Sequence, residues 1–239
     1  MALAGDHIQI LVAGYDLTGD LNRVSIDDTR KMLPVGVFGD TVEKFMPGQQ
    51  MAKVMHQGFL NADANRSHAV LDEIDAQGVV AVLVGQNADP LAGDPIYHLM
   101  TRQERYQVSA KVGQVIPFKA SFVNNGARAG WGTIIAPLTT IADSTTGSAV
   151  DNDSASTDGA AFLQILQTTA SDTYSTLIEG SADGATGWTT VASFTLDGSQ
   201  IGSERVEITG AIPQYLRYRA TRTGSAGDAL QLAVSLVRF

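Results

Sequence analysis

Side chains able to carry out chemistry are few in this chain of 239 residues, and none of them forms a recognised catalytic pattern. The four histidines show no H-x-x-x-H spacing, so each is interpreted as a surface or half-buried strand residue: His7, His56, His68 and His98. The absence of cysteine removes thiol catalysis, disulfides and any Cys-based zinc or iron–sulfur site. We therefore expect neither a metal centre nor a cofactor.

Carboxylates are more numerous, but their grouping favours a solvated surface over catalysis. The acidic run 151–154 (DNDS) resembles part of a calcium-binding loop. An EF-hand would need glycine at Ser156 and glutamate at Phe162, so only a looser calcium contact stays open there. The neighbouring carboxylates Asp27 and Asp28 are expected to lie at the surface.

Motifs for nucleotide and acyl chemistry are missing. Residues 126–132 (GARAGWG) have the wrong spacing for a phosphate-binding loop, and 180–184 (GSADG) place serine one position too early for a nucleophile elbow. Arg217, Arg219 and Arg222 could bind an anion, but alternation with apolar residues is expected to place them on the outer face of a strand. The sequence therefore predicts a protein that is not an enzyme.

Composition and charge narrow the class of protein further. The chain has 16 basic and 25 acidic residues, and its net charge of −9 argues against a dedicated nucleic-acid binder. The longest apolar run, residues 79–84, is far shorter than the ~20 residues of a membrane helix. The first six residues show no secretory signal. We expect no membrane partner, and a protein that stays inside the cell or leaves it within an assembly.

A change in composition divides the chain. Residues 139–159 consist almost entirely of Ser, Thr, Asp, Gly, Asn and Ala. Such a stretch buries too little apolar area to offset the entropy cost of ordering it. We therefore expect a β domain at 1–138, a linker or long mobile loop at 139–159, and a second β domain at 160–239.

Alternation of apolar and polar residues predicts a first domain made mainly of strands. The expected strands are 8–12, 24–26, 51–59, 79–84, 105–112 and 116–122. Of these, 79–84 is apolar throughout, as in a strand covered on both faces. Gly113 is expected to bend an extended hairpin arm formed by the last two. One short helix is expected to start at the cap residue Ser67 and to stop at Gly78.

The second domain is predicted to be a small β-sandwich. The expected strands are 162–167, 173–179, 189–196, 205–208, 215–222 and 230–237. In the fifth strand Leu216, Tyr218 and Ala220 share one face, and the apolar residues of 230–236 form a matching stripe. Two sheets that close on such stripes form a sandwich.

Short motifs follow one another in the first half of the chain: 14–18 (GYDLT), 21–24 (LNRV), 38–40 (FGD) and 47–48 (PG). In this order they resemble the opening of the major tail tube proteins of long-tailed bacteriophages, which commonly show G-x-D-(L/V)-(S/T), L-N-x-V, F-G-D and a P-G turn. The resemblance covers residues 7–125. Residues 160–239 resemble a β-sandwich appended to phage virion proteins, and we expect them to be exposed on the assembly.

The resemblance implies a fold and a mode of assembly. The fold would be a tail-tube-type β-sandwich or barrel, whose copies form hexameric rings that stack into a hollow tube for DNA ejection. The ring barrel would be closed by an arm containing Tyr106, Val108, Val112 and Phe118. The loop 39–50 would contact the next ring, although a plain surface hairpin stays open as an alternative. The residues implied at that contact are Asp40, Glu43, Lys44, Phe45, Met46, Pro47 and Gly48.

The implied partners are other copies of the chain and other tail proteins (tape measure, tail terminator and distal tail), in a virion tail assembled in the bacterial cytoplasm. DNA would be a non-specific passing cargo, and an acidic lumen would repel its phosphates. The alternative hypothesis is a carbohydrate- or surface-binding sandwich of another virion component. In that case Tyr174 and Trp188 would contact the ligand.

Overall fold

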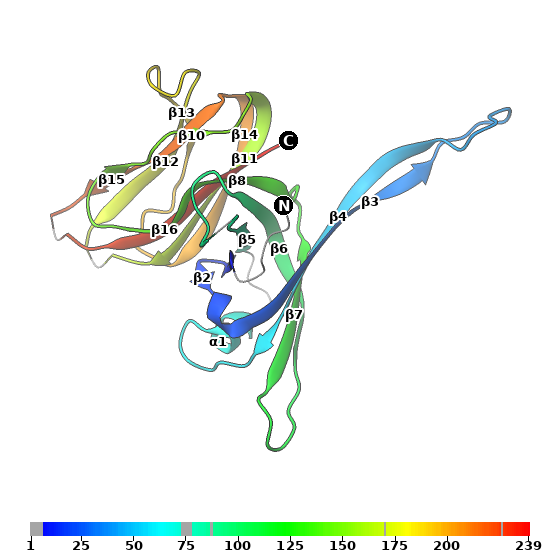
Figure 1. Cartoon of the computed structure of the whole chain (residues 1–239), viewed down its shortest axis with the longest axis horizontal. Helices are drawn as coiled ribbons and strands as arrows, with labels where there is room; N and C mark the ends of the chain where they lie inside the picture. Colours follow the sequence, from blue (N-terminus) through cyan, green and yellow to red (C-terminus); the bar gives the residue numbers. More distant parts are fainter. Residues whose placement is uncertain (1–6, 73–77, 87, 170, 226) are drawn as a thin grey trace.

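The computed structural model describes residues 7–239 except 73–77, 87, 170 and 226 (Figure 1). Within these residues the chain forms two antiparallel sheets and one short α-helix, α1 (Ser67–Leu71). This confirms the predicted mainly β fold class. No helix in this part of the chain has the length and apolar character needed to cross a membrane.

The larger sheet contains eleven strands. They are β1 (Ile8–Val12), β2 (Tyr15–Asp16), β3 (Leu21–Pro34), β4 (Phe45–Phe59), β5 (Gly78–Val84), β6 (Pro95–Val108), β7 (Pro117–Asn124), β8 (Gly130–Ile141), β11 (Ser156–Gln167), β14 (Gly202–Ile212) and β16 (Leu230–Arg238). The smaller sheet contains β9 (Thr145–Thr146), β10 (Val150–Asp151), β12 (Thr173–Ser181), β13 (Thr189–Ser193) and β15 (Tyr215–Thr223).

Strand β6 is the branch point of the larger sheet. Its first half lies between β5 and β8, in the order β14-β11-β16-β8-β6-β5-β1-β2. Its second half pairs with β7, which pairs with β4, which pairs with β3. The two ladders meet at Thr101, which is opposite Gly78 of β5 and Asn124 of β7. One sheet therefore serves both the body of the molecule and its projecting arms (Figure 1).

The smaller sheet packs on β14, β11, β16 and β8 and so completes the predicted C-terminal sandwich. Its core contains the stripe Leu216, Tyr218 and Ala220, all buried, as the alternation in this strand predicts. Opposite them lie the buried leucines and valine of β16. Burial of these stripes accounts for the two-layer arrangement.

Strands β11 and β16 also have an apolar second face, which packs on β5. Ala160, Phe162 and Val237 form one cluster with Val79. On the opposite side of β5, Val80 and Val82 enter a second core with residues of β1, β4, β6, β7 and α1. Strand β5 is therefore covered on both faces, which confirms the interpretation of the continuous apolar run at 79–84.

The helix differs from its prediction at both ends. Its N-cap residue is Arg66, and Ser67 is the first helical residue, whose backbone N–H donates to Asp20 Oδ2 at 2.9 Å. Gly78 does not stop a helix but opens β5, because it is already paired with Thr101. Residues 73–77 of the expected helix lie outside the described residues.

The segment 139–159, expected to be a linker or mobile loop, contains ordered pieces of both sheets. Strand β8 continues to Ile141, the short strands β9 and β10 pair with β15, and β11 begins at Ser156. Despite its low apolar content this segment is ordered, because its backbone forms ladder hydrogen bonds and because Ile141 and Val150 are both buried. The division into two domains stays a prediction, and the pairing of β8 with β16 runs across it.

Buried polar side chains join the first half of the chain to the second. Gln164 of β11 accepts the Gly14 N–H at 2.8 Å through Oε1, and its Nε2 donates to the Val79 carbonyl at 3.4 Å. His98 of β6 stacks on Phe162, with ring centroids 3.9 Å apart, and lies 2.6 Å from the Ser235 hydroxyl. These contacts are directional, so they specify how the layers align.

We predict that Gln164→Leu lowers the free energy of unfolding by about 1–3 kcal/mol, because it leaves the buried Gly14 N–H without an acceptor. Chemical denaturation of both proteins measures the difference. The matched control is Gln167→Leu at an exposed position of the same strand, which should change stability by less than about 0.5 kcal/mol. Equal effects of the two substitutions would contradict this account of Gln164.

Two buried histidines should make the fold sensitive to acid. Burial lowers the pKa of His56 and of His98 to about 3 from the ordinary value of 6.5. Below pH 6.5 these histidines bind protons in the unfolded chain but not in the folded chain. Their contribution to the free energy of unfolding is therefore fully present above this pH and is lost as the pH drops. The slope is about 1.4 kcal/mol per pH unit for each histidine.

We predict that His56→Leu makes the loss of stability between pH 6.5 and 5 less steep. Both ring nitrogens of His56 lack a hydrogen-bond partner among the described residues, so the substitution breaks no polar contact. The measurement is the free energy of unfolding at each pH. An unchanged slope in His56→Leu would show that this imidazole does not govern the acid response.

Candidate assembly surface

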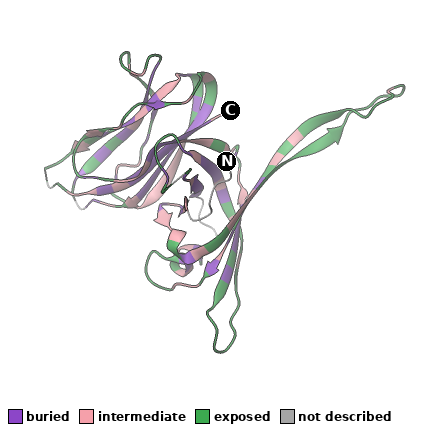
Figure 2. Cartoon of the chain, viewed as in Figure 1, coloured by how far each residue is buried: buried purple, intermediate pink, exposed green. Residues whose placement is uncertain are grey.

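The hairpin formed by β3 and β4 projects far from the body of the molecule (Figures 1 and 2). Its two strands stay paired from Leu21 opposite Gly58 to Pro34 opposite Phe45. Strand β7 supports β4 only between Lys53 and Phe59, so the outer half of the hairpin is a two-stranded ribbon. Such a two-stranded ribbon is marginally stable by itself.

The outer part of this hairpin has an unusually apolar surface. Val37 is 71% exposed and Phe38 fully exposed. The other exposed apolar residues of the hairpin tip are Met32, Leu33, Val35, Val42, Phe45 and Met46. Contiguous exposed apolar surface on a soluble chain marks an interaction site. We call residues 32–46 the tip of the long arm.

The structure brings all seven residues that the resemblance implied at the ring contact onto the long arm. Asp40 and Lys44 form an ion pair of 2.6 Å in the turn, and this contact, together with the Val37 N–H, lowers the pKa of Asp40. Four of the seven, Phe45 to Gly48, lie in β4 instead of in a loop. The sequence misses this because Pro47 and Gly48 are typical of turns, whereas here Pro47 sits opposite Met32 next to a bulge.

The second hairpin, β6–β7, is the short arm, and Gly113 lies in its turn with φ +79°, as expected. Val112 at the tip is fully exposed and Val108 partly so. Phe118, by contrast, is 1% exposed, and the Tyr106 hydroxyl lies 3.1 Å from His68 Nδ1. Phe118 lies on this hairpin, as expected, but its ring is buried in the core of its own chain beside α1.

The four-stranded sheet β3-β4-β7-β6 has an uncovered edge on each side. Strand β3 pairs only with β4, and no other described strand lies along its outer edge. Beyond Thr101, β6 pairs only with β7 among the described strands. One face of this sheet packs on the core through Val54, His56 and Phe122, and the other face is exposed. Uncovered edges are templates for pairing with another chain.

Of the two aromatic residues expected to contact a ligand, Tyr174 is buried and Trp188 is half-buried. Tyr174 is 1% exposed, and its hydroxyl donates to the Asp228 carbonyl at 3.0 Å. Trp188 is half-buried, and the Arg217 guanidinium lies over its ring at 4.0 Å. Its indole N–H donates to the Ala185 carbonyl. Tyr174 is thus a core residue, and Trp188 packs within a turn.

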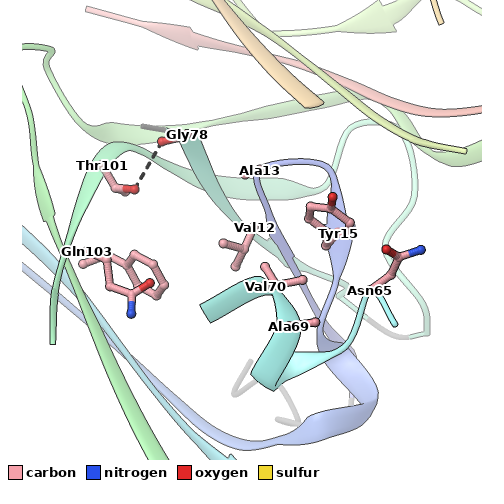
Figure 3. A pocket seen from close by; sticks show the side chains of 10 residues that line it. Val12, Ala13, Tyr15, Asn65, Ala69, Val70, Gly78, Thr101 and Gln103 are labelled. Carbon is pink, nitrogen blue, oxygen red and sulfur yellow. Dashed lines mark hydrogen bonds between the residues drawn. The ribbon is translucent and has the colours of Figure 1, made fainter. Parts of the chain in front are cut away.

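A small pocket of about 170 Å³ lies between α1 and strands β1, β5 and β6 (Figure 3). Its described lining includes Val12, Val70 and Gln103, and it contains no carboxylate, imidazole or amine. Across the described ranges, no group of three or more His, Asp or Glu side chains is placed to hold a metal ion. These side chains do not assemble a site for acid–base chemistry.

Sequence reasoning missed most of the apolar tip of the long arm. The signal was present: residues 32–38 (MLPVGVF) contain five large apolar side chains between two expected strands. Because they do not alternate with polar residues, their pattern does not indicate which of them would lie on a buried or an exposed face of a strand. An apolar run without periodicity, beside a turn, is the pattern that could have identified this surface.

Comparisons with known proteins give partial likenesses. No protein-family model and no curated protein matches the chain. Among solved structures, it is similar to a chain of the virion of a native gene transfer agent particle (12% identity, TM-score 0.44) and to a chain of the tail of an empty particle of that kind with C6 symmetry (13%, 0.42). Each likeness covers 54% of this chain and 98% of the other.

A third similar structure is the SPP1 Dit protein, described as a paradigm of the hub adsorption apparatus of phages that infect Gram-positive bacteria. The identity is 13%, the TM-score is 0.37, and the match covers 96% of this chain and 99% of that protein. All three TM-scores are below 0.5, so these likenesses establish neither a shared fold nor a shared function.

We predict that the double substitution Val37→Ser and Phe38→Ser weakens self-association at least tenfold, because burial of either side chain in an interface contributes about 1.5–3 kcal/mol. Both residues are exposed, so thermal unfolding of the single chain should be unchanged. Sedimentation velocity across a concentration series measures the association. Leu91→Ser, which removes a 61% exposed apolar side chain elsewhere, is the control and should have no effect.

Proposed function

We propose that this protein is a structural subunit of a bacteriophage tail, and that copies of it join into stacked rings that form the tail tube. The observation that carries the proposal is the four-stranded sheet with one uncovered edge on β3 and another on β6. Strand β3 of one copy would pair with the second half of β6 in the next copy. Closure of the ring would leave no free edge.

Strand direction supports this mode of joining. Each neighbouring pair in the order β3-β4-β7-β6 is antiparallel, so β3 and β6 run in opposite directions. In a ring with rotational symmetry, β3 would then lie antiparallel to β6 of the neighbouring copy. The alternation would continue around the whole barrel, and no junction would need a different hydrogen-bond pattern.

What packs on each face of the sheet determines which face would line the channel. One face carries the core of its own subunit, with α1, β1 and β5 packed against it. These layers would lie outside the barrel, because the closed sheet has no room for them inside. The exposed face of the sheet would therefore surround the channel, through which DNA would pass.

The two arms would connect successive rings. Phe59 of β4 is opposite Pro117 of β7, so the tip of the short arm and the tip of the long arm lie at opposite ends of the sheet (Figure 1). One arm would therefore reach the ring on one side and the other arm the ring on the other side. This contact would cover Val37, Phe38 and Val112, which are all exposed in the single chain.

The positions of the sequence motifs fit the proposal. Residues 14–18 form the turn from β1 through β2, and 21–24 begin the uncovered strand β3. Residues 38–40 lie in the turn of the long arm, and 47–48 lie in β4 beside it. The motifs that resemble tail tube proteins therefore surround the sheet and the arm that would make the ring.

We predict that paired cysteines crosslink neighbouring copies. The chain has no cysteine, so Ser25→Cys in β3 can be combined with Arg102→Cys, Arg105→Cys or Gln107→Cys in β6 without background. Within one copy β4 and β7 separate the two positions by about 14 Å, too far for a disulfide. At least one pair should give a ladder of oligomers on a non-reducing gel, and its largest member would count the subunits of the ring.

Single-cysteine variants and Ser25→Cys combined with Thr221→Cys, an exposed residue of β15, are the controls and should stop at dimers. Negative-stain electron microscopy of the wild-type chain across a concentration series should show rings or tubes of uniform width. Rings without a ladder would mean that another surface joins the copies. Monomers at every concentration, with no ladder, would refute the proposed function.

A further inference from the structure

The exposed face of the four-stranded sheet carries side chains in an order that the strand register defines. Directly opposite residues of antiparallel strands point to the same face. Three cross-strand rows result: Asp27, Lys53, Val123 and Arg102; Ser25, Met55, Ser121 and Arg105; and Arg23, Gln57, Lys119 and Gln107. Every row contains at least one cation.

This face is basic, although the whole chain has a net charge of −9. It carries five cations (Arg23, Lys53, Arg102, Arg105 and Lys119) and two carboxylates (Asp27 and Glu104), a net charge of +3. The acidic excess of the chain therefore lies on other surfaces. A local field follows the local charges and not the sum over the molecule.

Most of these cations are free to bind a ligand. Lys53 is neutralised by Glu104, whose carboxylate accepts its ammonium group at 2.5 Å and the Ser121 hydroxyl at 3.0 Å. Arg23, Arg105 and Lys119, and likewise Arg102, are exposed. No carboxylate of the described residues forms an ion pair with any of these four.

The surface between the cations is hollowed. A depression of about 370 Å³ is lined by residues that include Gln57, Glu104, Arg105, Lys119 and Ser121. Successive rows are about 7 Å apart along the strands. An extended ligand with regularly repeated negative charges can therefore contact several rows at once.

We propose that this face binds the phosphate backbone of duplex DNA. DNA carries one negative charge per about 1.7 Å of helix axis, which suits rows of unpaired arginine and lysine. The direction of the face toward the tube channel rests on the proposed function, and in that ring the rows of neighbouring copies would continue side by side around the channel. This proposal corrects the expectation of an acidic lumen that repels DNA, since that expectation used the charge of the whole chain.

The test is binding of a fluorescently labelled duplex of about 30 base pairs to the full-length protein, followed by anisotropy at increasing NaCl concentration. The variant combines Arg23→Gln, Arg105→Gln and Lys119→Gln. It should bind at least tenfold more weakly at low salt. The slope of log affinity against log salt should become less steep by about 2.7, because each phosphate that a cation neutralises contributes about 0.9 to this slope.

The matched control combines Lys31→Gln, Arg66→Gln and Lys111→Gln, three exposed cations outside the three rows. It changes the net charge equally and should leave most of the affinity intact. Equal weakening by both triple variants would overturn the proposal, and so would the absence of DNA binding by the wild-type chain at low salt.

Electron microscopy of the same proteins separates this inference from the proposed function. Rings formed by the triple variant, together with weaker DNA binding, support the inference. Lys119→Gln alone lies on the inner strand β7 and leaves both edge strands unchanged, so loss of rings in this single variant would overturn the inference, because the face would then contact another copy. DNA binding by a wild-type chain that forms no rings would refute the proposed function and leave the DNA-binding face in place.

Discussion

Strand β6 is the element on which the rest of the molecule depends, because it is hydrogen-bonded on both edges and changes partners at Thr101. Before this residue it belongs to the layered body, between β5 and β8. After it, the same strand is an uncovered edge of the sheet that carries both arms. The position of the proposed ring contacts is therefore set by the packing of the body, through a single continuous backbone.

Much of the fold is readable from the sequence, because strands with one or two buried faces leave a periodic pattern. The apolar run at 79–84 and the alternation of Leu216, Tyr218 and Ala220 identify strands that the structure contains. The pattern fails at 139–159, where hydrogen bonds to β15 order the backbone with few apolar contacts. It also fails at α1, where Asp20, distant in sequence, accepts the N–H of Ser67.

The candidate surface is harder to predict from the sequence, because a strand is an edge, and a set of side chains forms a face, only through its position relative to other strands. Residues near 40–48 can be singled out from their mixed charges and apolar side chains, yet nothing in β3 itself tells that its outer edge stays uncovered. The basic face is hidden in the same way. Its cations come from β3, β4, β6 and β7, and only the register of the strands brings them together.

The position of β16 has a consequence for how the protein is made. This strand is the last of the described strands to leave the ribosome, yet it lies between β11 and β8 in the middle of the larger sheet. Strands β8 and β11 cannot complete their pairing until β16 has been synthesised, so the sandwich closes only after that. Long-range strand pairing of this kind is slow. A chain that lacks β16 would leave β8 and β11 without the strand that joins them, and would lose the contact of Val237 with Val79 of β5.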